Sequence, residues 1–376
     1  MKTTKKKTLS RLAPMGMLAA ALLCVLALLL FGRESGDAAQ VSEPLPPASS
    51  LPAPSGLRIA VASDTHLDPE NTEKTAPLTE TVYNMEIADA MLWDARNQGA
   101  ELLLITGDLC NSGKPNKHEA LAAKLRAAEA AGLAVYVLPG NHDLGPVTQT
   151  AFAALYADFG YDEAFSRDAG SLSYCILRDE VMLLMMDTAG YPAGAIDLPD
   201  APARQDSQGF FTGDTLRWAE TMLQTAAERQ IPVLAAGHYN LLPEISRQAG
   251  SGYYVENGER FAALLREYGA PLYLSGHMHL RAVYREEGLT EQLTEYLIAY
   301  PTGYTLLDLT AESLTVRPRR VDVEAWAAAA GQEDPVLLHF ADWQERSFVS
   351  GTRRTVAAMA ERNPLSETEQ EAAILE

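Results

Sequence analysis

From Leu57 onward, apolar runs alternate with segments of helical periodicity. Continuous apolar runs are typical of strands buried on both faces of a sheet. The first three such runs are LRIAVAS (57–63), ELLLIT (101–106) and LAVYVLP (133–139). Between them, apolar positions at helical spacing predict a helix over 82–98 and an alanine-rich helix over 117–131. This order predicts strands and helices packed in layers.

The second half of the chain changes character. LSYCIL and VMLLMMD, separated by RDE, predict a β-hairpin, and an irregular stretch, 188–213, precedes a helix expected over 214–230. Further strands are expected at IPVLAAG (231–237), APLYLSG (270–276), EYLIAYP (295–301), YTLLDLT (304–310) and SLTVRP (313–318), the last three as antiparallel neighbours. The predicted fold is α/β, a four-layer αββα sandwich of two mixed sheets with helices outside.

The N-terminal segment differs from the rest of the chain. Lysines and Arg11 precede an apolar stretch from Leu12 to Phe31. This stretch suits a membrane-spanning helix of about 20 residues better than the shorter apolar region of a signal peptide. Because basic flanks stay in the cytoplasm, we expect a signal anchor with the remaining chain exported. The alternative is a cleaved signal peptide and a secreted protein, although Gly36-Asp37-Ala38 is a poor cleavage site.

Composition then divides the chain into four parts. We expect an anchor over 1–33, a Pro/Ser/Ala-rich linker over 34–56, a catalytic domain over 57–320, and a helical extension over 321–376 that is broken by two prolines. The formal charge of −20 argues against a nucleic-acid-binding surface. Outside the anchor the only cysteines are Cys110 and Cys175, so at most one intrachain disulfide could form.

Metal-binding residue types follow five of the expected strands. The motifs are SDTHL with Asp64 and His66, TGDLCNSG with Asp108, PGNHDL with Asn141, His142 and Asp143, GH with His238, and GHMH with His277 and His279. Loops at the carboxyl ends of strands converge in open α/β folds. Five of the seven histidines fall in these motifs, whereas His118 and His339 do not.

The residue types and their spacing suggest a metal centre. In an extended strand, a D-x-H or H-x-H pair places both side chains on the same side, and glycines allow close backbone approach. Carboxylates and imidazoles together select divalent transition metals. With His142 and Asp143 set aside, seven candidate ligands remain, enough for two ions bridged by one carboxylate. Taken singly, Asp64 could instead cap a turn or helix, Asp108 could form an Asx turn, and Asn141 a tight turn.

These five motifs, in this order, resemble those of the calcineurin-like metallophosphoesterases: D-x-H, G-D, G-N-H-[DE], G-H and G-H-x-H. The resemblance runs from about Leu57 to Pro318, and GDLCNSG and PGNHD look like the branch related to bacterial cyclic-nucleotide phosphodiesterases. The sequence departs from relatives at two positions. Asn111 stands where purple acid phosphatases carry a metal-binding tyrosine, and Tyr239 stands where many relatives carry a further histidine.

The resemblance implies roles for nine residues. One metal would be held by Asp64, His66, Asp108 and His279, and Asp108 would bridge to a second metal held by Asn141, His238 and His277. His142 would face the substrate phosphate as a hydrogen-bond or proton donor, and Asp143 would orient it. The expected cofactors are two divalent transition-metal ions, Mn, Fe or Zn.

The expected activity is hydrolysis of phosphodiester or phosphomonoester bonds. Two cations would neutralise the phosphate oxygens, and a hydroxide bridging them would be the nucleophile. Two alternatives remain: a phosphatase for lipid-linked or protein phosphates in the cell envelope, and an inactive surface-binding module. We expect specificity to lie in the loops 188–213 and 241–258, which contain several aromatic residues.

Overall fold

A computed structural model describes residues 56–71, 81–178, 181–190, 197, 208–242, 251–310 and 313–362. The predicted anchor, the predicted linker up to residue 55 and much of the loops 188–213 and 241–258 lie outside these residues. Within them, every helix is too short or too polar to span a bilayer.

The first sheet has five strands in the order β12-β11-β1-β2-β3. The three strands β1, β2 and β3 are parallel, and β11 and β12 add in antiparallel fashion on the other side of β1. Their bounds are β1 Leu57–Ala62, β2 Leu102–Ile105, β3 Ala134–Val137, β11 Gly303–Leu309 and β12 Leu314–Arg320.

The second sheet has seven strands in the order β4-β5-β6-β7-β8-β10-β9. Its central strands β6, β7, β8 and β10 are parallel, with antiparallel neighbours at both edges. The bounds are β4 Ser166–Arg167, β5 Tyr174–Arg178, β6 Val181–Met185, β7 Val233–Ala236, β8 Leu272–Ser275, β9 Ala282–Glu286 and β10 Leu289–Leu293.

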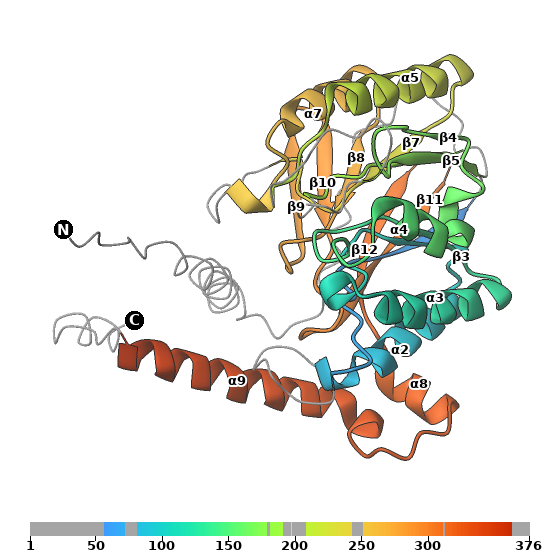
Figure 1. Ribbon diagram of the computed structural model, residues 1–376. Helices are drawn as coiled ribbons and strands as arrows, with labels where there is room; N and C mark the ends of the chain where they lie inside the picture. The colour runs from blue at the N-terminus through green and yellow to red at the C-terminus, as the bar shows by residue number, and fades with distance from the viewer. Residues whose placement is uncertain are drawn as a thin grey trace, which may run out of the picture.

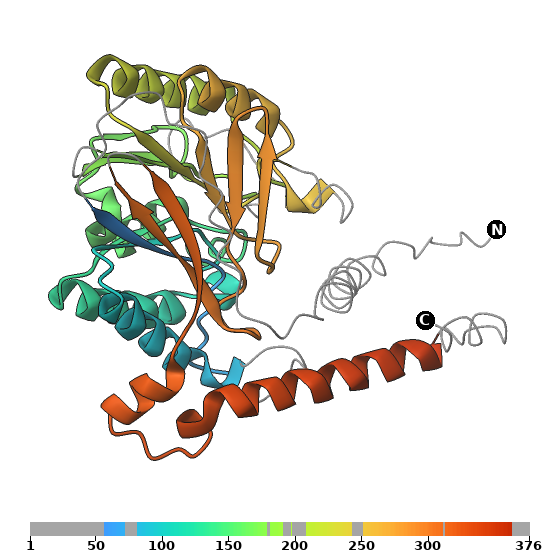
Figure 2. The same cartoon turned by 180° about the vertical axis from the view of Figure 1, so that it is seen from behind.

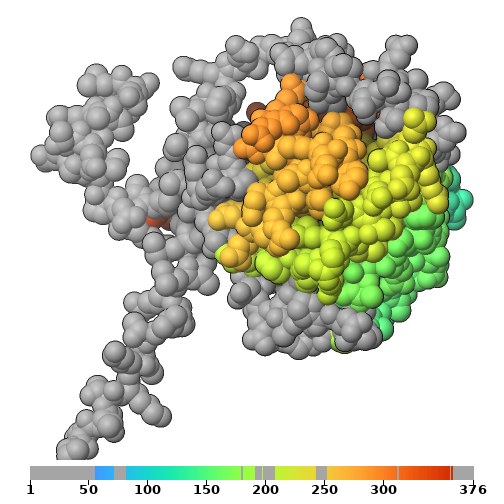
Figure 3. Space-filling model, turned by 90° about the horizontal axis from the view of Figure 1, so that it is seen from above, coloured from blue at the N-terminus to red at the C-terminus, as the bar shows by residue number. Residues whose placement is uncertain are grey.

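The helices cover the outer faces of the two sheets (Figures 1 and 2). The α-helices are α2 Asn84–Asn97, α3 Pro115–Ala130, α4 Gln149–Leu155, α5 Gly213–Arg229, α7 Gly258–Glu267, α8 Val323–Ala329 and α9 Phe340–Arg362. The shorter helical turns are η1 Thr81–Tyr83, η2 Asn111–Gly113, η3 Ala157–Tyr161, η4 Ser251–Tyr253 and η5 Leu337–His339. Helices α5 and α7 cover the seven-stranded sheet (Figure 1) and lie side by side on the face seen in Figure 3. Helix α9 extends away from the body (Figure 1).

Alternating residues of the central strands face different apolar layers. On β6, Leu183 and Met185 join the core between the two sheets, while Met182 and Leu184 join the layer beneath α5 and α7. This alternation is what a period of two requires when both faces of a strand are covered. Two mixed sheets with helices on their outer faces agree with the predicted α/β fold.

One predicted strand is wrong. The segment 295–301 was predicted as a strand, but it contributes to none of the named strands. Its contact with the chain just after β1 is an isolated bridge between Ser63 and Tyr296. β1 already has β2 and β11 as neighbours, so its sheet has no free edge for a further strand there. The strands just before this segment, β9 and β10, were not predicted. β10 has no apolar run, because it buries polar residues such as Glu291 and Gln292, and β9 is half-buried or exposed.

The other expected elements mostly agree with the structure. The helices expected over 82–98, 117–131 and 214–230 correspond to α2, α3 and α5. The extension from residue 321 is helical through α8 and α9, and its second proline lies outside the described residues. Cys110 and Cys175 are free and buried, so they form no disulfide.

Candidate metal centre

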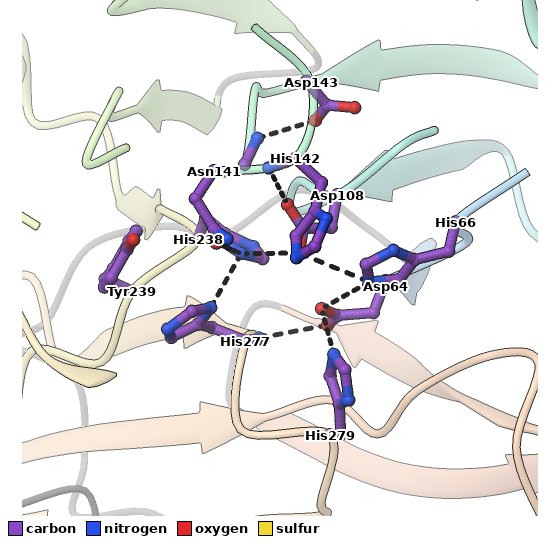
Figure 4. A network of polar contacts seen from close by, with 12 residues as sticks. Asp64, His66, Asp108, Asn141, His142, Asp143, His238, Tyr239, His277 and His279 are labelled. Atoms are coloured by element: carbon purple, nitrogen blue, oxygen red, sulfur yellow. Dashed lines mark hydrogen bonds and ion pairs between the residues drawn. The ribbon is translucent and has the colours of Figure 1, made fainter. Parts of the chain in front are cut away.

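All five motifs meet at one edge of the paired sheets. Each follows directly on a parallel strand: β1, β2 and β3 in one sheet, and β7 and β8 in the other. Parallel strands present their carboxyl ends at the same edge, so the loops after them converge. Figure 4 shows the side chains of the seven predicted ligands pointing inward from both sheets toward a common centre.

The first group of potential ligands comprises Asp64, His66, Asp108 and His279, whose ligand atoms lie within 4.8 Å of one another. His66 Nε2 lies 3.3 Å from Asp108 Oδ2 and 3.7 Å from Asp64 Oδ1. His279 Nε2 lies 3.2 Å from Asp64 Oδ1. Both carboxylates are fully buried.

A second group comprises Asp108, His238 and His277. His238 Nε2 lies 3.4 Å from Asp108 Oδ2 and 3.1 Å from Asn141 Oδ1, and His277 Nδ1 lies 3.2 Å from His238 Nε2. Asn141 therefore adds an amide oxygen to this group. Because Asp108 belongs to both groups, the structure places the seven predicted ligands as two sets that share one carboxylate.

Hydrogen bonds outside the centre fix which histidine nitrogen faces it. His238 Nδ1 donates to the carbonyl oxygen of Thr106 (2.9 Å), and His277 Nε2 donates to that of Gly252 (2.9 Å). His238 Nε2 and His277 Nδ1 therefore face the centre, 3.2 Å apart, and each carries a lone pair when its ring is neutral. An outward hydrogen bond of this kind is the usual companion of a metal-binding histidine.

The donor set fits divalent transition-metal ions. Asp64 Oδ1 and His66 Nε2 are buried and have no hydrogen-bond partner among the described residues. Buried polar atoms without a partner are costly, and converging lone pairs repel one another. A cation that accepts these lone pairs would satisfy both groups, and imidazole with carboxylate selects transition metals over calcium.

The electrostatic field of the centre favours positive charge. Burial alone would lower the pKa of His66 and His238, but Asp108 and Asp64 outweigh it and raise these pKa values to about 10 and about 9. Burial opposes ionisation of Asp64 and Asp108, yet the neighbouring histidines lower both pKa values well below the usual range. The same field would attract divalent cations.

The backbone at these motifs is not extended. Positive φ angles occur at Asp64 (53°), His66 (38°), Asp108 (50°), His277 (66°) and His279 (56°). The expectation that each D-x-H or H-x-H pair lies on strand-like backbone is therefore wrong, because the strands end before the ligands begin. Non-glycine residues with left-handed φ store strain, which clusters at functional sites where the surrounding structure imposes it.

Glycines next to the motifs allow the loops to approach closely, as expected. A Cβ on Gly107 would lie 2.6 Å from the His238 ring, and one on Gly276 would lie 2.6 Å from Asp64 Oδ2. The loops after β1 and β2 also run in parallel, since Asp64 N donates to Gly107 O and His66 N to Asp108 O.

His142 stands over the first group of ligands. Its Nε2 lies 3.9 Å from Asp108 Oδ2, its ring packs edge-on against His66 at 4.8 Å, and its side chain is 45% exposed. Its backbone N–H donates to Asp108 Oδ1 (2.9 Å). Burial lowers the pKa of its ring. The side chain is thus accessible to a substrate while the backbone orients the shared carboxylate.

Asp143 holds the loops rather than the ring of His142. Its buried carboxylate accepts hydrogen bonds from the backbone N–H groups of Leu109 (3.0 Å), Cys110 (2.9 Å) and Gly140 (2.7 Å). The expected contact with the His142 ring is not among these bonds, and in Figure 4 the carboxylate points away from that ring. Asp143 therefore positions the backbone that carries Asp108 and Asn141.

Cys110, His118 and Asp143 form a third buried cluster of metal-binding residue types. Both ring nitrogens of His118 already have partners, the hydroxyl of Tyr156 (2.8 Å) and the carbonyl oxygen of Asp143 (2.9 Å). The carboxylate of Asp143 is occupied by three N–H groups, and burial raises the pKa of the Cys110 thiol. This cluster is satisfied as it stands and is not a metal site.

The two departures from the family pattern lie at different distances from the centre. Tyr239 is fully buried and packs its ring against His277 at 4.1 Å. Asn111 is exposed, and its side chain reaches Asp68. Sequence reasoning missed Tyr296, whose ring stacks on His279 at 4.2 Å, and Glu291, which contacts the loop after β7 and the last residue of β8. Neither belongs to a motif.

Comparison with known proteins agrees with the fold. The family model for calcineurin-like phosphoesterase matches residues 57–281. Among solved structures, a dimetal phosphatase from Danio rerio has a TM-score of 0.50 at 12% identity, with 73% of this chain and 99% of that one covered. A purple acid phosphatase from yellow lupin (Lupinus luteus) has a TM-score of 0.48 at 12% identity, with 71% and 52% covered. No curated protein matches the chain. At these identities the structural likeness shows the fold alone.

Proposed function

Since the chain belongs to the calcineurin-like phosphoesterase family and is a hydrolase of phosphoester bonds, we propose that it acts through a dinuclear metal centre at the edge of the two sheets. The observation that carries this proposal is Asp108, whose carboxylate lies within reach of both ligand groups. In this assignment Asp64, His66 and His279 complete one site. Asn141, His238 and His277 complete the other.

The metal ions, His142 and Asp143 then have separate roles in the reaction. Two divalent cations, when bound, would neutralise phosphate oxygens and lower the pKa of a coordinated water. His142, exposed beside Asp108, would donate a hydrogen bond to a phosphate oxygen or a proton to the leaving alcohol. Asp143 would keep the Asp108 loop against the Asn141 loop through its three backbone hydrogen bonds. Positioning and electrostatics would supply most of the acceleration.

The substrate is a phosphodiester or a phosphomonoester. GDLCNSG and PGNHD favour the branch related to cyclic-nucleotide phosphodiesterases. The apolar stretch 12–31 with its basic flank favours a membrane-anchored domain outside the cytoplasm, where lipid-linked or protein phosphates of the envelope would also be within reach. We propose the domain boundaries 57–320 and 321–376 for the catalytic part and its helical extension.

One experiment tests this function. Purified full chain is assayed on activated aryl mono- and diesters with Mn²⁺, Fe²⁺ or Zn²⁺ added singly, and its metal content is measured. Asp108→Ala should lose most of both ions, because it removes the shared ligand. His142→Ala should keep the metal and the fold but lose activity by roughly 10²- to 10⁴-fold, as removal of a proton donor does.

His339→Ala is the matched control, since His339 is exposed and lies in η5, outside the five motif loops. It should retain both metal content and activity. A folded, active protein without metal would contradict the dinuclear proposal. A metal-loaded protein that hydrolyses no phosphoester would favour the binding-module alternative instead.

A further inference from the structure

A short segment beyond the end of the family match contacts ring ligands of the first group and residues next to the ligands of the second. The match ends at residue 281, and the segment comprises residues 291–296, which begin in β10 and continue past its end. Glu291 reaches the loops of the second group, whereas Tyr296 reaches two ring ligands of the first. We call it the support segment.

Glu291 joins the two loops that carry His238 and His277. Its carboxylate is completely buried. It accepts hydrogen bonds from Leu241 N (3.0 Å), Leu242 N (2.6 Å), Asn240 Nδ2 (3.3 Å) and Ser275 Oγ (2.6 Å). The first three donors lie just after His238, and Ser275 ends β8, two residues before His277 and four before His279. One side chain therefore fixes the spacing of the two loops.

Burying the Glu291 carboxylate costs desolvation free energy. Its hydrogen-bond donors are all neutral, and burial raises the pKa of Glu291 to about 7 even though these donors lower it. A buried acid that served only to fill space would be better replaced by an apolar residue, which costs no desolvation. Its full set of donors indicates a positioning role, because a satisfied buried network specifies one arrangement of the backbone.

Tyr296 supports the other ligand group. Its ring stacks on His279 with centroids 4.2 Å apart and an interplanar angle of 28°, and it meets His66 edge-on at 5.0 Å. The backbone is held beside Asp64, since Ser63 and Tyr296 form an isolated bridge and Leu297 N donates to Ser63 O (3.3 Å). The tyrosine thus limits the rotation of the His66 and His279 rings, two of the three ligands that belong to the first group alone.

We propose that the support segment sets the affinities of the two metal ions separately, with Glu291 acting on the ion held by His238 and His277 and Tyr296 acting on the ion held by His66 and His279. This proposal rests on the dinuclear function proposed above. Both are positioning residues, since neither is a ligand. Hydrogen-bond partners of metal ligands typically contribute ten- to a hundredfold to metal affinity, and we expect the backbone support given by Glu291 to fall in this range.

The test isolates each ion in turn. His279→Ala leaves the second ligand set intact, and His277→Ala leaves the first. In each background, Mn²⁺ is titrated into metal-stripped full chain and its dissociation constant is measured by calorimetry or by the electron paramagnetic resonance of free Mn²⁺. Glu291→Gln and Tyr296→Leu are then added separately, so that each substitution is tested on both ions.

Glu291→Gln should weaken Mn²⁺ binding roughly ten- to a hundredfold in the His279→Ala background and much less in the His277→Ala background, because three of its four donors follow His238. Tyr296→Leu should show the opposite preference, by roughly two- to tenfold, the range expected for one aromatic pair. Tyr296→Phe should restore most of this loss because it keeps the ring. Ser275→Ala removes one hydrogen-bond donor to Glu291 and should lower the affinity for the same ion as Glu291→Gln does. It replaces Glu291→Gln in the test if Glu291→Gln folds poorly.

Equal changes in both backgrounds, or none, would overturn the proposal while leaving the dinuclear function intact. If neither parent background binds Mn²⁺ and the wild-type chain binds none, the proposed function fails first and this inference fails with it.

Discussion

At the scale of single residues, His118 makes a pH-dependent contribution to stability. The ring is completely buried, and burial lowers its pKa to about 4 from a usual value of 6.5, although the Asp143 carbonyl opposes this shift. Between these values the unfolded chain binds a proton that the folded chain excludes. The free energy of unfolding should therefore be highest above pH 6.5 and fall toward pH 4, by up to about 3 kcal/mol.

Urea unfolding of metal-stripped protein at several pH values between 4 and 7 measures this effect. His118→Gln should show a shallower fall than the wild type, since it has no group to protonate. His339→Gln removes an exposed histidine and is the matched control. Parallel curves for the wild type and His118→Gln would show that His118 does not contribute.

The ligand residues could be predicted individually because each belongs to a short motif next to an apolar run. What the sequence did not reveal was their backbone geometry. The left-handed φ at Asp64 and Asp108 arises from contacts between loops distant in sequence, such as Asp64 N with Gly107 O. The backbone contacts of Asp143 were not predictable for the same reason: its partners are N–H groups, which every residue except proline carries and no motif marks.

At the scale of elements, the turn after β2 depends on a glycine. Gly107 has a φ of +101°, and a Cβ there would lie 2.6 Å from the ring of His238. Gly107→Ala should therefore lower stability through backbone strain, by roughly 1–2 kcal/mol, and also displace a metal ligand. Metal content and thermal unfolding, measured together, separate these two effects.

Gly132 offers the matched control. It follows α3 with a φ of +95°, and a Cβ there would meet no atom within 4 Å. Gly132→Ala should show a similar loss of stability with normal metal content. If Gly107→Ala also bound metal normally, the close approach of the β2 and β7 loops would not be needed for the site.

Apolar strands and periodic helices were predictable because the side chains that they bury are apolar and follow a regular pattern along the chain. β10 was not, since Thr290, Glu291 and Gln292 read as polar loop yet are buried. Their partners come from β8 and the loop after β7, and such long-range pairing overrides local pattern. The apolar segment 295–301 gave the opposite error: it was predicted as a strand, but its residues are buried or half-buried outside any named strand, because β1 already has a neighbour on each side.

At the scale of the whole molecule, charge is distributed unevenly along the chain. The formal charge is −20 overall, yet the segment before Leu12 carries four lysines and an arginine and one run of three consecutive lysines. A uniformly acidic chain would be explained by solubility alone. The basic N-terminal segment followed by apolar residues 12–31 is the pattern that orients a membrane anchor with its N-terminus in the cytoplasm.

We therefore predict that the full-length protein stays with membranes after salt and carbonate washing. Protease added from outside should release an active phosphoesterase domain by cutting within residues 34–56, whose Pro/Ser/Ala-rich composition suits an accessible linker. A variant with Leu22→Arg and Leu26→Arg should lose membrane association, because each charge at the centre of a span is costly. Recovery of a soluble mature chain beginning near Ala39 would instead establish a cleaved signal peptide, and would remove the argument for membrane-bound substrates while leaving the metal centre as it is.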